Sequence, residues 1–176
     1  MIDFSQDHFA LFGLAPCYGL DQRTLDDAYR RLQKKVHPDR YAAAAENERR
    51  RALQSSARVN EAYRTLKDPV GRAQYLLSLN GIDAMSETDT ALPREFLERA
   101  LDRREAVSEA AEKSDGPALD ALLAEVRDDM RALDRALERE FDSARALDTA
   151  RTKVRELKFL SKLAADIESA IADLES

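Results

Sequence analysis

The chain has 176 residues, of which 44% are hydrophobic and 35% charged, and its formal net charge is -6. This composition indicates a soluble globular protein, and the single cysteine excludes an internal disulfide. No apolar run is long enough to cross a bilayer and no signal pattern opens the chain, so we expect a cytoplasmic protein with no membrane segment. With only five glycines and five prolines, and no alternating strand pattern, an all-α protein is predicted.

A basic amphipathic helix is predicted before residue 37. Its apolar residues recur at the period of one helix face and are Leu25, Ala28, Tyr29, Leu32 and Val36. Asp21 is well placed to cap the start of this helix. Pro38 has no amide hydrogen and disfavours helical geometry in the residue before it, so the helix is expected to end near Val36 or His37. His37 and Asp39 are then presented on a turn.

A second long helix is predicted over residues 46–67. Its stripe is formed by Ala52, Ser56, Val59, Ala62, Tyr63 and Leu66, and the two stripes suit an antiparallel hairpin. Opposite the stripe of the first helix lie four cations, Arg30, Arg31, Lys34 and Lys35. A basic face is usually only solvated, but like charges one turn apart repel each other. Beside an exposed turn, that repulsion favours an acidic partner surface.

The tripeptide His37-Pro38-Asp39 has three interpretations from the residues alone. Pro and Asp are common in loops, so it is either a plain turn between helices or a docking loop beside the basic helix. A catalytic His/Asp pair would also need a pocket and a nucleophile or metal. One cysteine and two histidines supply none of the usual ligand pairs, so no metal site is predicted. The negative net charge and the lack of aromatic platforms argue against nucleic acid as a partner.

Charge divides the chain into two parts. Residues 1–75 have 13 Lys and Arg against 10 Asp and Glu, whereas the remainder has 15 against 24. We therefore expect a first domain over residues 1–75 and a second over residues 93–176, with a linker over residues 76–92.

A short helix is expected where the first part ends. Asp68-Pro69 is a helix stop, and Asn80-Gly81 is the next turn signal. The stretch between them contains the apolar residues Tyr75, Leu76, Leu77 and Leu79. We expect this helix to pack against one or both domains, followed by a polar loop from Asp83 to Leu92.

The acidic part predicts three helices, and their short connections make sequential helices antiparallel neighbours in a three-helix bundle. The first begins at Pro93 and runs to a turn at residues 114–117, with a stripe of Phe96, Leu97, Ala100, Leu101, Val107 and Ala111. The second carries Leu119, Leu122, Leu123, Val126, Met130, Leu133 and Leu137 and fades near residues 141–143. The third carries Leu147, Ala150, Val154, Leu157, Leu160, Ala164, Ile167, Ile171 and Leu174, spaced like a coiled-coil seam.

Two features of this part do not follow from packing. An acidic ridge runs along the first helix and consists of Glu98, Asp102, Glu105, Glu109 and Glu112. Such a ridge is usually a solvated face. Phe159 falls two residues after Leu157 and, at about 100° per residue, points away from the seam. It is either a rim contact to another helix or an exposed anchor for a partner.

The first part resembles the J domain, the module by which co-chaperones activate DnaK-type ATPase chaperones. The resemblance rests on the basic helix, the His37-Pro38-Asp39 loop and the segment Asn60-Glu61-Ala62-Tyr63-Arg64-Thr65-Leu66. It implies that the tripeptide triggers ATP hydrolysis in the partner chaperone. It also implies an electrostatic docking face of Arg30, Arg31, Lys34 and Lys35. Arg40 stands where lysine is frequent, which keeps the charge.

Nearly the whole chain resembles the HscB family, the J-type co-chaperones of iron-sulfur cluster assembly. The resemblance adds Phe9-Ala10-Leu11-Phe12-Gly13-Leu14, the junction from Arg72 to Gly81, and the late segment from Val154 to Leu160. The Gly/Phe-rich stretch and zinc-binding cysteine repeats of general J proteins do not occur in this sequence. Some relatives carry an N-terminal extension with metal-binding cysteines, which we do not expect in this protein. No metal or other cofactor is therefore implied.

In that family the C-terminal helices bind the scaffold protein IscU and deliver it to the chaperone HscA. The matching positions imply a client surface made of Leu97, Leu101, Asp102, Glu105, Glu109 and Phe159. At least one of the two leucines must be exposed for this, and the sequence does not tell which. Glu98 stands where the family often has an apolar residue, which would weaken that contact or replace it by a charge pair.

The resemblance thus implies a non-enzymatic adaptor, monomeric or weakly dimeric. It would bind an IscU-type scaffold and stimulate an HscA/DnaK-type chaperone. One alternative is a J-domain co-chaperone with a different client, and another uses the C-terminal helices for dimerisation. A small helical hydrolase that uses His37 and Asp39 is the alternative of a different class, and it would turn over substrate without any chaperone.

Overall fold

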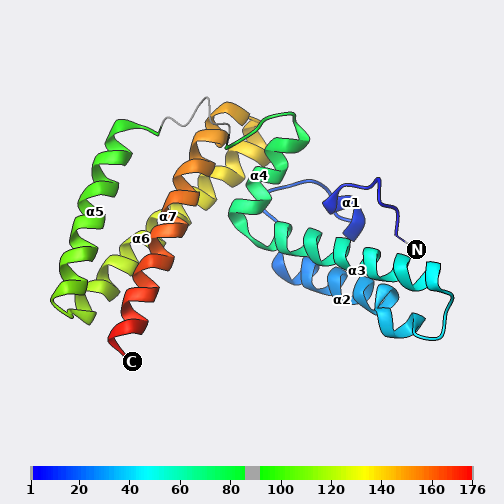
Figure 1. Ribbon diagram of the computed structural model, residues 1–176. Coiled ribbons are helices and arrows are strands. Elements are labelled where there is room, and N and C mark those ends of the chain that lie inside the picture. The colour runs from blue at the N-terminus through cyan, green and yellow to red at the C-terminus, as the bar shows by residue number, and fades with distance from the viewer. Residues whose placement is uncertain (1, 86–91, 176) are drawn as a thin grey trace. The chain divides into compact units, whose positions relative to one another are not determined.

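The computed structural model describes residues 2–85 and 92–175, and those residues form helices, turns and loops without a strand. They make two compact units, Met1–Leu79 and Asn80–Ser176 (Figure 1). The all-α prediction is confirmed. Within the described ranges, no helix combines the length and the apolar character needed to cross a membrane.

The first unit is built around a helical hairpin. Its elements are α1 (His8–Phe12), α2 (Gln22–Val36), η1 (Pro38–Tyr41), α3 (Glu46–Lys67) and α4 (Pro69–Leu79). Helices α2 and α3 lie side by side, as predicted (Figure 1). Asp21 caps α2 by accepting a hydrogen bond from the Thr24 N–H (2.9 Å). The stripes of both helices supply the core, in which Phe9, Leu25, Val59, Ala62, Leu66 and Leu77 are fully buried.

An aromatic contact holds α1 on α4. The ring centroids of His8 and Tyr75 are 4.1 Å apart, and the His8 N–H donates to the Tyr75 hydroxyl (2.9 Å). His8 is only 5% exposed, and its Nδ1 has no hydrogen-bond partner among the described residues. Burial lowers the pKa of His8 below its ordinary value of 6.5, and the neighbouring Arg58 charge adds to this effect.

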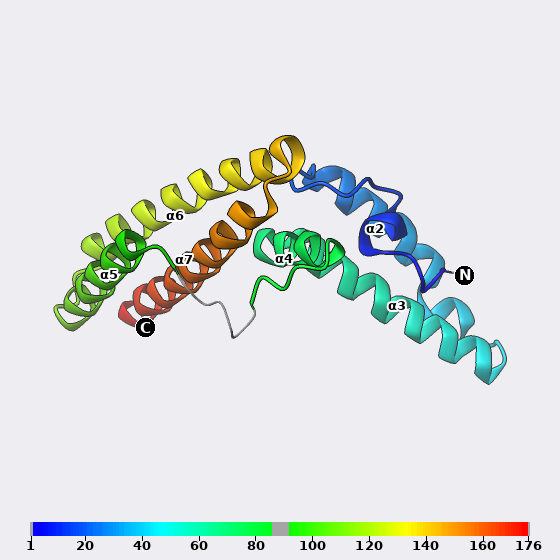
Figure 2. The same ribbon diagram turned by 90° about the horizontal axis from the view of Figure 1, so that it is seen from above.

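The second unit is a three-helix arrangement, as predicted. Its elements are α5 (Arg94–Glu112), α6 (Gly116–Glu138), the π-helical turn η2 (Arg139–Ala144) and α7 (Leu147–Leu174). Figure 2 shows α6 and α7 running along each other, and α5 packs against both. The principal core residues are Phe96, Ala100, Leu119, Leu123, Val126, Leu160, Leu163 and Ile167.

Residues in left-handed conformation end both α5 and the π-helical turn. The predicted turn at residues 114–117 is present, but its left-handed residue is Ser114 (φ 55°) rather than a glycine. The Asp115 N–H bonds to the Ala110 carbonyl (2.9 Å) and the Ser114 N–H to the Ala111 carbonyl (3.1 Å), which closes α5 as a Schellman motif. Arg145 (φ 51°) plays the same part after η2 and leads into α7.

The segment predicted as a linker, residues 76–92, is divided between the two units. Its first residues complete α4, where Leu76 and Leu77 are buried in the first unit. In the second unit the carbonyl of buried Ala84 accepts a hydrogen bond from Arg155 Nε (2.8 Å). Residues 86–91, the middle of the predicted loop, lie outside the described residues, so the linker and the domain limits stay predictions.

Buried His8 predicts a stability that depends on pH. Its pKa is lowered in the folded chain, so the unfolded chain binds the proton more tightly, and stability is lost as the pH falls below 6.5. Between about pH 7.5 and about pH 5.5, the free energy of unfolding should fall further in the wild type than in His8→Phe, which keeps a ring against Tyr75 without a titrating group. Urea unfolding measures both, and equal pH dependence in the two chains would contradict the assignment.

Candidate functional site

The turn after α2 exposes His37 and Asp39, as the sequence predicts. Helix α2 ends at Val36, and Pro38 opens the single 3-10 turn η1 because it has no amide hydrogen to continue the helix. The His37 side chain is 53% exposed and that of Asp39 is 89% exposed. Both polar groups are therefore accessible to a partner.

The His37 ring lies close to Asp39. Its Nδ1 accepts a hydrogen bond from the Asp39 N–H (3.3 Å), and the same nitrogen lies 3.5 Å from Asp39 Oδ2. The turn therefore presents an imidazole and a carboxylate next to each other.

Two side chains of the turn bond to the C-terminal end of α2. Arg40 Nη1 donates to the Lys34 carbonyl (2.9 Å), and the Tyr41 hydroxyl donates to the Lys35 carbonyl (3.3 Å). The last carbonyls of a helix have no partner within it, so these bonds satisfy them and hold the turn against α2. Sequence reasoning assigned Arg40 only a charge and missed Tyr41, because no residue spacing signals a bond of this kind.

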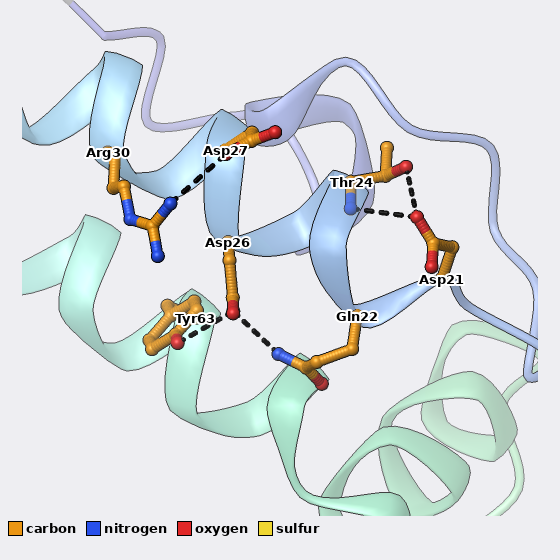
Figure 3. Close-up of polar contacts among 7 residues, drawn as sticks. All are labelled: Asp21, Gln22, Thr24, Asp26, Asp27, Arg30 and Tyr63. Carbon is orange, nitrogen blue, oxygen red and sulfur yellow. Dashed lines mark hydrogen bonds and ion pairs between the residues drawn. The ribbon is translucent and has the colours of Figure 1, made fainter.

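The basic face, defined as Arg30, Arg31, Lys34 and Lys35 of α2, is exposed along its whole length. Arg30 forms an exposed ion pair with Asp27 (3.2 Å; Figure 3). Across the described ranges, no carboxylate lies within ion-pair distance of the other three cations. Three positive charges thus remain uncompensated beside the turn, which makes this surface attractive to an acidic partner.

A polar clamp joins α2 to α3 behind the basic face. The rings of Tyr29 and Tyr63 stack with centroids 4.0 Å apart and planes at 17°. Asn60 Oδ1 accepts hydrogen bonds from the Tyr29 hydroxyl (2.9 Å) and from Gln33 Nε2. Because the donors are on α2 and the acceptor on α3, the clamp fixes the two helices relative to each other.

Asp26 extends the clamp toward the start of α2. Its Oδ1 accepts from Gln22 Nε2 (2.6 Å) and from the Tyr63 hydroxyl (2.9 Å), as Figure 3 shows. Both hydrogen bonds lower the pKa of Asp26 below its ordinary value because they favour the carboxylate, and the bond from Gln22 has the larger effect. Sequence reasoning did not identify the clamp. Its local signals were the four-residue spacings of Gln22 with Asp26 and of Tyr29 with Gln33.

Helix α5 exposes both of the leucines assigned to the client surface. Leu97 is 47% exposed and Leu101 is 59% exposed. The sequence placed both in the apolar stripe of this helix and left open which one faces solvent. Both lie outside the core, because the buried side chains of α5 are Phe96, Ala100 and Ala110. Each leucine follows a buried residue directly, and one residue turns the side chain by about 100°.

Phe159 of α7 is a rim contact, the first of its two predicted alternatives. Its ring meets that of Phe96 edge-on, with centroids 5.6 Å apart and planes at 82°. The Arg104 guanidinium lies over the same ring, 4.9 Å from its centroid. Phe159 is therefore partly buried between the core and an exposed cation.

The acidic ridge of α5, made of Glu98, Asp102, Glu105, Glu109 and Glu112, is exposed throughout. Glu98 pairs with Arg94 (2.8 Å) near one end. Near the other end, a hydrogen bond from Lys113 lowers the pKa of the Glu109 carboxyl. No cation of the described chain forms an ion pair with Asp102 or Glu105. The middle of the ridge therefore keeps two uncompensated negative charges beside Leu101.

The predicted site residues form two groups, one on each unit. The first unit holds the turn, its Arg40 and the basic face. The second holds the α5 leucines and carboxylates, with Phe159 coming from α7. Exposed charge and exposed apolar side chains suit the docking of other proteins.

Comparison with known proteins places this pair of units in a family. A model described as the DnaJ domain matches residues 7–75, and one described as the HSCB C-terminal oligomerisation domain matches residues 92–168. A co-chaperone protein HscB homolog from Burkholderia vietnamiensis is 44% identical over 176 residues, which is 100% of both chains. The chain belongs to the HscB co-chaperone family.

Solved structures of HscB proteins have the same fold. The chaperone HscB from Vibrio cholerae is 35% identical, with a TM-score of 0.85 over 96% of this chain and 99% of that one. The human co-chaperone protein HscB is 26% identical, with a TM-score of 0.88 over 94% of this chain and 82% of that one. The first unit is thus the J domain of an HscB-family co-chaperone.

Removal of the Asn60 acceptor should loosen the J domain. Asn60→Ala leaves the Tyr29 hydroxyl and the Gln33 amide without their acceptor, so we expect the free energy of unfolding to fall by about 1–2 kcal/mol. All five tyrosines lie in the first unit, so tyrosine fluorescence during urea unfolding reports on this unit alone.

Gln54→Ala is the matched control for Asn60→Ala. Gln54 is exposed on the same helix, and its replacement should change the free energy of unfolding by less than about 0.5 kcal/mol. Equal stability of Asn60→Ala and Gln54→Ala would show that the clamp contributes nothing.

Proposed function

We propose that this co-chaperone binds an IscU-type iron-sulfur scaffold protein and delivers it to an HscA/DnaK-type chaperone. The chain would stimulate ATP hydrolysis in that chaperone through His37, Pro38 and Asp39, and would itself catalyse no reaction. The observation that carries the proposal is that each unit keeps an exposed surface with charges uncompensated inside the described chain. These charges are positive on the J domain and negative on α5.

The chaperone side of the proposal is supported by the turn and the basic face. Arg31, Lys34 and Lys35 are free to attract an acidic surface and to speed the encounter. Once docked, the pair formed by His37 and Asp39 would make the specific contacts. Because Arg40 and Tyr41 hold the turn against α2, little of its conformational freedom would be lost on binding.

The client side of the proposal is supported by the α5 surface. Leu97 and Leu101 are exposed on a helix whose neighbouring side chains include the unpaired carboxylates Asp102 and Glu105. In protein interfaces, apolar side chains anchor the centre and charged side chains around them select a partner of opposite charge. Phe159 would contribute the accessible part of its ring, and Glu109 would extend the acidic contact.

Joining the two surfaces in one chain gives the proposal its mechanism. A client held by the second unit is kept at a high effective concentration near a chaperone held by the first. No new contact between client and chaperone is needed for this effect. In this proposal, residues 1–75 form the chaperone-docking domain and residues 93–176 the client domain. The proposed site of action is the cytoplasm.

A second candidate function uses the same α5 surface for self-association. The family model matching residues 92–168 is described as an oligomerisation domain, and two exposed leucines on one helix can pair with a second copy. A J-domain co-chaperone with another client is the related alternative. Sedimentation of the purified chain, alone and with an IscU-type scaffold, distinguishes the two functions.

Asp39→Asn should abolish stimulation of the chaperone's ATPase. The side chain is 89% exposed, so its loss should leave the fold intact while removing the charge that we assign to the trigger. Single-turnover ATP hydrolysis by an HscA-type chaperone is the measurement, with circular dichroism as the check on folding. The trigger assignment is wrong if the folded Asp39→Asn chain stimulates as well as the wild type.

The double variant Leu97→Ala/Leu101→Ala should weaken binding of an IscU-type scaffold roughly tenfold or more, since each leucine loses about 1 kcal/mol or more of apolar burial. Calorimetric titration measures the affinity. The variant leaves Phe159 in place because that ring packs on Phe96, and its loss would also disturb the core.

The control for the leucine pair is Leu174→Ala. Leu174 is 39% exposed at the end of α7 in the same unit, and its truncation should leave the affinity for the scaffold unchanged. Wild-type affinity in the double variant would exclude the α5 surface as the client site.

A further inference from the structure

Leu53 is an exposed leucine on α3 that the packing of the J domain does not use. It is 58% exposed, whereas the α3 side chains that enter the core are Ala52, Ser55, Val59, Ala62 and Leu66. A single exposed leucine is common in soluble proteins and is not by itself a site. Leu53 differs from other exposed leucines because it lies next to a groove between α2 and α3.

Leu53 shares one face of α3 with Ser56 and Asn60. Arg49, Leu53, Ser56 and Asn60 follow one another at spacings of four, three and four, which places them in one line along the helix. Ser56 and Asn60 also line an open groove between α2 and α3 of about 500 Å³, whose other lining residues are Tyr29, Arg30, Gln33, Lys34 and His37. The line on α3 therefore leads from this groove to Leu53.

Two unpaired cations lie along this surface, one in the groove and one beyond it on the same line of α3. Lys34 on the α2 side and Arg49 on the α3 side have no acidic partner among the described residues. Arg30 is paired with Asp27 (3.2 Å) and Arg50 with Glu46 (3.1 Å). Both ion pairs are exposed and therefore weak. Unpaired positive charge thus lies in the groove, at Lys34, and one helical turn beyond Leu53, at Arg49.

We propose that the chaperone-docking surface crosses from α2 to α3, with Leu53 as its apolar anchor and Arg49 as an additional cation. This inference rests on the proposed docking of a DnaK-type chaperone. The partner element that fits is an acidic segment carrying one apolar side chain. Its carboxylates would meet Lys34 and Arg49, and its apolar group would cover Leu53. Charge alone would dock many acidic surfaces, whereas the apolar contact selects among them.

Residues of the clamp line the groove and join its two sides. Tyr29, Gln33 and Asn60 are bonded to one another across the hairpin, so the two sides of the groove cannot move apart without breaking those bonds. His37 lies on the groove and also belongs to the turn. A segment seated in the groove would therefore be guided to the proposed trigger.

Leu53→Ala tests the anchor, with Leu79→Ala as the matched control. Leu79 is 43% exposed and belongs to the same unit. It lies at the end of α4, which contributes no residue to the groove. Leu53→Ala should raise the concentration of co-chaperone needed for half-maximal ATPase stimulation roughly fivefold to tenfold. Its maximal stimulation should match the wild type because His37 and Asp39 are intact. Leu79→Ala should change neither value.

Salt dependence separates the anchor from the cation. The defect of Arg49→Ala should shrink as ionic strength rises and screens the charge, while that of Leu53→Ala should persist. Tyrosine fluorescence during unfolding should show wild-type stability for both variants, because both side chains are exposed. A Leu53→Ala defect that vanished at high salt would contradict an apolar contact.

The outcomes distinguish this inference from the proposed function. If Asp39→Asn abolishes stimulation while Leu53→Ala behaves as the wild type, the surface on α3 is excluded and the proposed function stands. If Asp39→Asn stimulates normally, the proposed trigger fails, and direct calorimetric binding of the same DnaK-type chaperone then tests the surface alone. Equal affinities of the wild-type and Leu53→Ala chains would overturn it.

Discussion

Each long helix of this chain has one apolar stripe to bury against its neighbours, and the two proposed docking surfaces lie on the sides that this burial leaves in solvent. In the J domain, the stripes containing Leu25 and Val59 close on each other and bury both residues completely. The basic face is then in solvent because it occupies the opposite side of α2. In the second unit, Phe96 and Ala100 turn inward, so Leu97 and Leu101 must lie outside.

The end of α2 shows how a short segment is made both accessible and rigid. Pro38 cannot continue the helix, which forces the chain into a turn whose polar side chains face solvent. An exposed turn would ordinarily be mobile, but the hydrogen bonds from Arg40 and Tyr41 attach it to α2. The polar clamp in turn attaches α2 to α3. A partner that docked here, as proposed, would meet side chains already held in place by the fold.

Under the proposed function, the opposite charges of the two surfaces would help to keep the two partners apart. An acidic partner is attracted to the basic face and repelled by the middle of the acidic ridge, where Asp102 and Glu105 are uncompensated. A basic partner experiences the reverse. Like-charge contacts weaken wrong pairings and opposite charges strengthen right ones, so the division of charge along the chain would favour the correct partner at each surface.

Most of the architecture was accessible from residue order because helices are local structures. The period of the apolar residues and the positions of Asp21, Pro38 and Asp68-Pro69 predicted α2 and α3 closely, and the three helices of the second unit were also expected. The residues at the turn and on the basic face could be named for the same reason. Whether Leu97 lies in the core or in solvent depends on where α6 and α7 pack, since Phe96 and Leu97 both fit the helical period. The bonds of Arg40 and Asn60 join residues that only the folded chain brings together, and no local pattern encodes a contact made across helices.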